Sequence, residues 1–258
     1  MKNTYRIWFQ GATDRPFMAP YIAKVEAHFK AILDPEFTCT FNTTTPPATT
    51  THALTEYRVG YNFVRNAVRA EREGYDAVAI THFQDAALDQ VKSAVDIPVL
   101  GLGETTLYFA CTLGRKLGLV TINPTFIPWH EDQVIRYGLQ QRVVGVRAVD
   151  AAVLDYIAAF SSREKYDLLK PLWERECRAL LAAGADVIVP AGGLPMMLYG
   201  AESGASIDGA PIVNGMSVIA KAAEMAIKLK RDAGIAVSRR SNFVRPPEKA
   251  LKEFLEPG

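Results

Sequence analysis

Few residues of the kinds that build metal sites and disulfide frameworks occur in this sequence. Its three cysteines, Cys39, Cys111 and Cys177, are an odd number without a Cys-x-x-Cys spacing, and its four histidines include no pair at a spacing typical of a metal site. The sequence therefore indicates neither a disulfide framework nor a bound metal. We interpret the cysteines as small apolar packing residues.

An excess of one charge and a long apolar run are also missing. The formal net charge over 258 residues is +1, so neither nucleic acid nor an anionic membrane is an expected partner. No apolar stretch approaches the roughly 18 residues that suggest a membrane span. The first residues, 1–6, contain no signal-peptide hydrophobic region. A cytoplasmic protein is expected, with small molecules or other copies of itself as partners.

Short apolar runs typical of strands alternate with longer segments of helical periodicity. Several of the strand candidates lack polar alternation, as do strands buried on both faces of a parallel sheet. The candidate strands are 5–10, 37–41, 76–81, 97–100, 117–121, 143–146, 186–191 and 211–213, and the candidate helices are 18–33, 59–73, 105–117, 133–137, 164–183 and 217–231. This alternation predicts an α/β fold with doubly wound parallel sheets.

Two stretches of the chain repeat one pattern. Residues 74–82 read GYDAVAITH, and residues 184–192 read GADVIVPAG. Each contains a glycine that ends a helix, a short apolar strand and a turn, and each is followed by a second strand led by proline. The copies differ at the turn, where His82 in the first corresponds to Gly192 in the second.

The repeat predicts two Rossmann-like lobes with parallel sheets and an active site in the cleft between them. Because the chain must cross between the lobes, we expect residues 1–101 and 214–258 to form lobe one. Residues 102–213 are expected to form lobe two.

The turn of the first copy carries the candidate catalytic residues. His82 follows an apolar strand at its carboxyl end, which is the ligand edge of a parallel sheet. A helix is expected to begin directly after it, so that Phe83, Gln84 and Asp85 offer N–H groups to a substrate. We interpret His82 as a general acid or base, with a structural role as the alternative. Asp85 would orient the imidazole or cap that helix.

Further candidate substrate-binding residues end other strands at the same edge. Gly192, Gly193 and Leu194 form a turn in which the glycines allow close backbone approach and can offer N–H donors, although a tight turn alone would explain them. Gln10 and Thr121 end the first strand of each lobe and could hydrogen-bond a substrate, although loop polarity would also explain Gln10.

Two segments have the composition of irregular structure. Residues 43–51, with a Pro-Pro pair, are expected to form a loop on the ligand side or a plain surface loop. Residues 238–258 carry three arginines and a short amphipathic end. This tail is expected to pack on its own lobe or on a neighbouring subunit rather than to bind nucleic acid.

The chain resembles the aspartate/glutamate/hydantoin racemase superfamily, and in particular its hydantoin and allantoin racemase branch. The resemblance covers nearly the whole chain. It rests on REGYDAV at 72–78, DIPVLGLGE at 96–104, YGL at 137–139, VRAVD at 146–150, GADVIV at 184–189 and PIV with a following glycine at 211–215. It implies two α/β lobes related by pseudo-two-fold symmetry, a substrate between them, no cofactor and a homo-oligomer.

The resemblance also implies a cysteine at a strand end in each lobe, acting as acid or base on opposite faces of a carbon acid. Those positions correspond to His82 and to Gly192 or Gly193, and none is cysteine. An imidazole can carry a proton, whereas a glycine cannot. The leading hypothesis is therefore one-sided acid/base chemistry on a small carboxylate, cyclic amide or hydantoin-like substrate.

In this hypothesis His82 is the proton carrier of an isomerase, decarboxylase or lyase. Three alternatives remain open: a hydrolase in which His82 activates water, a non-catalytic small-molecule binder, and a hydantoin-type racemase with substituted bases.

Overall fold

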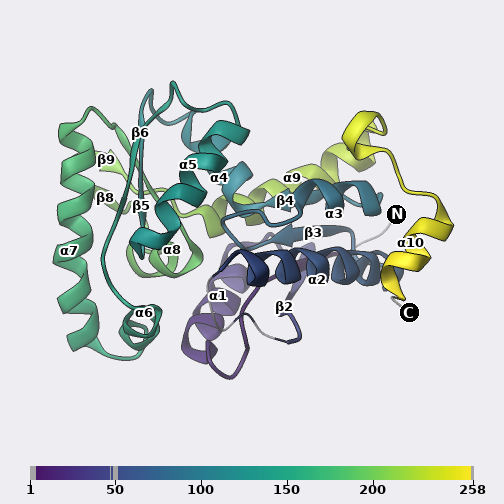
Figure 1. The fold of residues 1–258 in the computed structure, drawn as a ribbon, viewed down its shortest axis with the longest axis horizontal. Helices are drawn as coiled ribbons and strands as arrows, with labels where there is room; N and C mark the ends of the chain where they lie inside the picture. Colours follow the sequence, from purple (N-terminus) through teal and green to yellow (C-terminus); the bar gives the residue numbers. More distant parts are fainter. Residues whose placement is uncertain (1–3, 47, 49–51, 257–258) are drawn as a thin grey trace. The chain divides into compact units, whose positions relative to one another are not determined.

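The computed structural model describes residues 4–46, 48 and 52–256, whose elements are drawn in Figure 1. Contacts divide the chain into two compact units. The first holds the chain up to Phe17, Phe29–Gly101 and the chain from Ile219 onward, and the second holds Met18–His28 and Leu102–Val218. This division differs from the predicted boundaries in grouping 18–28 and 214–218 with the second unit. No helix of the described residues is long and apolar enough to cross a membrane.

The first unit contains a four-stranded parallel sheet in the order β2-β1-β3-β4. Its strands are β1 (Tyr5–Gln10), β2 (Phe37–Asn42), β3 (Ala77–Ile80) and β4 (Val99–Gly101). The unit also contains the helices α2 (Ala53–Arg72), α3 (Leu88–Ala94), η2 (Ser241–Phe243) and α10 (Glu248–Leu255). Two further helices are divided between the units: α1 (Ala19–Ile32) ends in the first unit, and α9 (Gly215–Ala233) begins in the second and continues in the first.

Both faces of this sheet are covered, as its apolar strands require. Because side chains alternate along a strand, successive residues of β1 enter different halves of the core. Trp8 packs with Phe63 of α2 and Val78 of β3 in one buried cluster. Phe9 instead stacks on Phe29 of α1, with ring centroids 3.7 Å apart.

The second unit contains a three-stranded parallel sheet in the order β6-β5-β7 and a two-stranded antiparallel ribbon. The strands are β5 (Leu117–Thr121), β6 (Val143–Ala148), β7 (Val187–Pro190), β8 (Ser206–Ile207) and β9 (Ala210–Pro211). The helices are α4 (Leu102–Ala110), η1 (Pro124–Phe126), α5 (Ile127–Arg136), α6 (Val153–Ala159), α7 (Arg163–Ala182) and α8 (Gly193–Tyr199). The predicted α/β class with parallel sheets is confirmed.

The internal repeat extends beyond the stretches from which it was predicted, and corresponding residues lie 110 positions apart. Helices α2 and α7 both have 20 residues and begin at positions 53 and 163. In the first sheet Ile7 pairs with Ala77, and in the second Leu117 pairs with Val187. The two sheets therefore pair their first strand with the strand of the repeat in the same register.

Side-chain hydrogen bonds follow the same offset. The carboxylate of Asp76 accepts a bond of 2.7 Å from the backbone N–H of Arg6, and that of Asp186 accepts one of 2.8 Å from Lys116. Both aspartates stand just before the strand of the repeat, where they tie it to the start of the neighbouring strand. The aspartates shared by the two sequence copies thus have one structural role.

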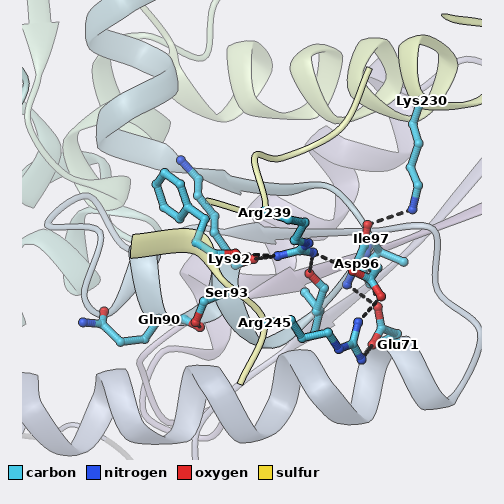
Figure 2. A network of polar contacts seen from close by, with 11 residues as sticks. Glu71, Gln90, Lys92, Ser93, Asp96, Ile97, Lys230, Arg239 and Arg245 are labelled. Atoms are coloured by element: carbon cyan, nitrogen blue, oxygen red, sulfur yellow. Dashed lines mark hydrogen bonds and ion pairs between the residues drawn. The ribbon is translucent and has the colours of Figure 1, made fainter. Parts of the chain in front are cut away.

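The C-terminal tail packs on the first unit, in agreement with the first of its predicted roles. Figure 2 shows how its arginines reach two acids near the start of β4. Arg239 donates to the carboxylate of Asp96 (2.7 Å), and Arg245 pairs with both Asp96 and Glu71. Lys230 of α9 donates to the carbonyl of Asp96 (2.7 Å). Beyond these contacts α10 packs on α2 through a pair of aromatic rings.

Two predictions about individual segments need correction or restriction. The helix expected over 105–117 begins earlier and ends at Ala110, because the residues after it turn into β5. Of the predicted loop 43–51, residues 47 and 49–51 lie outside the described part of the chain. The residues that are described there, 43–46 and 48, belong to no helix or strand.

Candidate functional site

His82 stands at the carboxyl end of the first unit's sheet, where the sequence places it. Strand β3 ends at Ile80, and the backbone N–H of Thr81 still donates to the carbonyl of Gln10 (2.8 Å) on β1. His82 is the next residue, and its side chain is 15% exposed. The sheet therefore fixes the position of the backbone at His82.

The imidazole pairs with a carboxylate that sequence reasoning missed. Nε2 of His82 lies 3.4 Å from Oε1 of Glu56, whose side chain is 21% exposed. Glu56 occupies the first turn of α2, a helix capped by the His52 ring, which accepts from the N–H of Thr55 (3.2 Å). An acid in a first turn ordinarily only complements the helix dipole. Its pairing with His82 comes from the packing of α2 on β3.

Burial and two carboxylates act in opposite directions on the pKa of His82. Burial favours the neutral imidazole and is the largest influence, yet the charge and hydrogen bond of Glu56, helped by the charge of Asp85, outweigh it. The pKa of His82 is therefore raised above its ordinary value of 6.5. A stronger base with a partner for its conjugate acid is suited to carrying a proton.

The two ring nitrogens of His82 have different surroundings. Because an ionised carboxylate can only accept, Nε2 carries the proton that faces Glu56. Nδ1 is then the unprotonated nitrogen of the neutral ring. It is buried and has no hydrogen-bond partner among the described residues. A buried polar atom without a partner calls for an explanation, and a ligand that approaches Nδ1 would supply one.

Asp85 does not cap the helix that follows His82. Helix α3 begins six residues after the imidazole, its N-cap is Ala87, and no side chain caps it. Asp85 is buried in the intervening turn with φ 55°, where its N–H donates to the carbonyl of His82 (3.0 Å). A Cβ on Gly101 would stand 2.5 Å from its carboxylate oxygen, so the side chain is directed toward the end of β4. Its effect on His82 is electrostatic.

The residues between His82 and Asp85 also differ from expectation. Because α3 starts later than predicted, Phe83 and Gln84 lie in a turn rather than in a first helical turn. The Phe83 ring is in the core, 2% exposed, and Gln84 is half-buried. Neither offers the N–H groups of a helix N-terminus.

Gln10 ends β1 as predicted, but its amide is engaged within the protein. Its Oε1 accepts from the indole of Trp8 (2.9 Å) and from the amide of Asn66 (3.0 Å), while its Nε2 donates to the carbonyl of Gly11 (2.8 Å). The residue is fully buried. These bonds give Gln10 a structural role.

The turn of the second copy leads straight into a helix. Gly192 has φ 147°, a conformation open to glycine, and α8 begins at Gly193. Leu194 is buried in the first turn of that helix. At Gly193 the Tyr21 side chain approaches the backbone closely, and a Cβ at this position would collide with the Tyr21 hydroxyl oxygen.

Thr121 ends β5 at the corresponding edge of the second unit and is buried there. Its hydroxyl lies 3.2 Å from Nε2 of His130, whose Nδ1 lies 3.3 Å from Oε1 of Gln133. This buried network holds α5 against the strand end. Within the described residues, no group of three His, Cys, Asp or Glu side chains is arranged to hold a metal ion.

Comparison with known proteins identifies the family. The model of the Asp/Glu/Hydantoin racemase family matches residues 19–223. The chain belongs to this family. A hydantoin racemase from Pseudomonas sp. (strain NS671) is 28% identical over 210 residues, which cover 81% of this chain and 80% of that protein. A hydantoin racemase from Rhizobium meliloti is 28% identical over 182 residues, covering 70% and 71%. The named relatives are racemases, and racemases are isomerases.

Solved structures support the fold. An allantoin racemase from Klebsiella pneumoniae superimposes with a TM-score of 0.80 at 20% identity and covers 96% of each chain. An allantoin racemase from Pseudomonas fluorescens gives a TM-score of 0.78 at 21% identity, covering 93% of this chain and 97% of that one. At these identities the likeness establishes the two-domain α/β architecture of this enzyme family.

Proposed function

We propose that this racemase-family enzyme transfers a proton at a carbon next to a carbonyl group in a hydantoin-like cyclic amide, without a cofactor. The observation that carries the proposal is the His82–Glu56 pair at the carboxyl end of β3. The 28% identity to hydantoin racemases supports the substrate class, since such a substrate contains a carbon acid between a carbonyl and a ring nitrogen.

Nδ1 of neutral His82 would accept the proton from carbon, and the electron pair of the broken C–H bond would move onto the carbonyl oxygen. The imidazolium so formed is stabilised by Glu56, in the manner of a base oriented by a carboxylate. Return of the proton to carbon, or to another atom of the delocalised anion, restores neutral His82. Positions 192 and 193 have no side chain that could take part, so His82 alone carries protons in this proposal.

The test is the enzyme's reaction in D2O with single enantiomers of 5-monosubstituted hydantoins, followed both by deuterium uptake at C5 and by optical rotation. One-sided chemistry predicts that deuterium uptake outruns the loss of rotation, because the same group removes and returns the proton. Uptake and loss of rotation at equal initial rates would show a second proton carrier and contradict the one-sided mechanism. A 5,5-disubstituted hydantoin, which has no C5 proton, is the control for binding without exchange.

No deuterium uptake from any monosubstituted hydantoin would contradict the substrate class. Uptake of solvent ¹⁸O into a ring-opened product would point to hydrolysis instead.

A further inference from the structure

A groove of about 890 Å³, which we call the arginine groove, lies between β2, the second half of α2 and the end of α10. All of these elements belong to the first unit. The described part of its lining carries four arginines and a single acid: Arg15, Arg65, Arg69, Arg72 and Glu256. The net charge of the whole chain, in contrast, is only +1. The groove is therefore a local concentration of positive charge on a nearly neutral molecule.

Three of the arginines form a polar stripe along one side of α2, because residues three or four positions apart are neighbours on a helix. The residues of the stripe are Asn62, Arg65, Asn66, Arg69 and Arg72. Like charges at this spacing repel one another. Within the described part of the chain, neither Arg65 nor Arg72 forms an ion pair, and Arg69 pairs with Glu73 at 3.5 Å. Carboxylates of the protein thus compensate little of the repulsion.

The second copy of the repeat shows that the fold does not require this charge. At the offset of 110 residues, the stripe of α2 corresponds to Leu172, Arg175, Glu176, Ala179 and Ala182 of α7. Arg175 is the one basic residue of that set, and its guanidinium lies 2.8 Å from the carboxylate of Glu176. A helix of the same length therefore packs on the second sheet without a basic stripe. The arginines of α2 have a role that is specific to the first unit.

Contacts within the protein hold two of the guanidinium groups in position. Arg15 donates to the carbonyl of Phe41 (2.7 Å), and Arg69 lies over the ring of Trp8 with its Cζ 4.7 Å from the centroid. A guanidinium has five N–H donors, which is more than these contacts use. Because the groups are ordered before a ligand arrives, binding costs less conformational entropy than it would with freely rotating side chains.

We propose that the arginine groove binds a small molecule that carries a phosphate or diphosphate group. Guanidinium forks match phosphate oxygens through paired N–H bonds, and several of them together favour a ligand with more than one negative charge. The volume of the groove lies in the range typical of small-molecule sites, roughly 300–1,000 Å³. A nucleic acid would instead require positive charge over an extended surface, which a net charge of +1 does not favour.

The proposed site is separate from the one that contains His82. Glu56, the partner of His82, occupies the first turn of α2, whereas the arginines occupy the second half of that helix. At a rise of about 1.5 Å per residue, Glu56 and Arg65 are about 14 Å apart along the helix axis. A phosphate held by the arginines is therefore bound away from the imidazole, and the inference does not depend on the proposed function.

The test is calorimetric titration of the protein with inorganic pyrophosphate at neutral pH. Citrate, a carboxylate with a similar number of charges, distinguishes recognition of phosphate from attraction to negative charge alone. Arg65→Gln and Arg72→Gln each remove one guanidinium from the groove. Arg175→Gln is the matched control, because it removes the same charge at the position of α7 that corresponds to Arg65. In that control Glu176 keeps its contact with Arg147, at 2.6 Å.

We expect one pyrophosphate to bind per chain, and to bind more tightly than citrate. Arg65→Gln and Arg72→Gln should each weaken binding by about tenfold, because each removes hydrogen bonds between charged groups. Arg175→Gln should leave the affinity within about twofold of the parent value. In NMR spectra of the parent protein, pyrophosphate should shift the backbone amide signals of residues 40–45 and 62–72.

The inference would be overturned by an absence of saturable binding, by unchanged affinity in Arg65→Gln and Arg72→Gln, or by NMR shifts confined to residues outside the groove. Equal weakening by Arg175→Gln would also overturn it, since binding would then follow overall charge. Citrate that binds as tightly as pyrophosphate would overturn the phosphate class of ligand. Because every readout is binding, none of these results bears on whether the enzyme acts on hydantoins.

Discussion

His82 gains its chemical character from neighbours that are distant in sequence. Glu56 precedes it by 26 residues and reaches it from the first turn of α2, while Asp85 acts from the turn behind it. The predicted catalytic histidine thus lies at the predicted strand end. Its polarising partner could not have been predicted, because nothing in the spacing of Glu56 distinguishes it from an acid that complements a helix dipole.

Removal of the Glu56 charge should make His82 a weaker base. In Glu56→Gln, burial still favours the neutral imidazole and only Asp85 opposes it, so the pKa of His82 should fall. NMR titration of the four imidazoles measures this directly, with His28, bonded to Ser217, as an internal reference. The acid limb of the pH profile of kcat/KM should move to lower pH in parallel. A matched control is Glu131→Gln, which changes an exposed acid of α5.

An unchanged His82 pKa in Glu56→Gln would mean that the 3.4 Å contact does not polarise the ring. A fall in the pKa of His82 without a shift of the acid limb of the kcat/KM profile would mean that another group is the base.

At the scale of secondary-structure elements, the two copies of the repeat correspond up to the turns that follow β3 and β7 and differ beyond them. Helices α2 and α7, the strands that follow them and the glycines between them correspond at an offset of 110 residues. After Gly192 the next helix begins at once, whereas after His82 five residues of turn intervene. The expectation of a helix directly after His82 was wrong because a local pattern of apolar residues does not reveal such a turn.

The two repeated aspartates should contribute similarly to stability. Asp76→Ala and Asp186→Ala each remove a carboxylate that accepts backbone N–H bonds, so each should lower the free energy of unfolding by about 1 kcal/mol. Urea denaturation measures this, with Asp132→Ala on the exposed face of α5 as the control.

The N–H bonds of Arg115 and Lys116 hold the pKa of Asp186 below its ordinary value. The loss in Asp186→Ala should therefore be present at neutral pH and shrink as pH falls through that lowered pKa. A loss confined to one of the two aspartates would contradict their equivalence.

The C-terminal tail should loosen when its shared acid is removed. Asp96→Ala deletes the carboxylate that both Arg239 and Arg245 reach (Figure 2). Because these groups are partly exposed, the expected loss of global stability is small, about 1 kcal/mol or less. Local opening should instead appear as faster amide exchange in α10 and faster proteolysis after residue 234. Asp89→Ala, an exposed acid of α3, is the control, and equal exchange in both variants would refute the role of Asp96.

At the scale of the whole molecule, the alternation of strands and helices was sufficient to predict the fold class, and the resemblance was sufficient to predict the family. The side-chain contacts that could not be predicted from the sequence depend on how the segments pack. Gln10 was expected to face a substrate, yet Trp8 and Asn66 occupy its amide. The contact of Tyr21 with Gly193 carried no sequence signal, since a tyrosine within an amphipathic helix is ordinarily a core residue. Both outcomes depend on contacts between segments far apart in the chain.

The named relatives of this enzyme are racemases, and we propose that it uses one imidazole, that of His82, as its proton carrier. The most direct test is the rate of deuterium incorporation at C5 of a 5-monosubstituted hydantoin in D2O, measured by NMR for the parent enzyme, His82→Gln and the control His28→Gln. Loss of a general base typically costs about 10²- to 10⁴-fold in rate, so His82→Gln should fall by that factor while His28→Gln keeps the parent rate. Exchange by His82→Gln within a few-fold of the parent rate would contradict the role of His82 as the proton carrier.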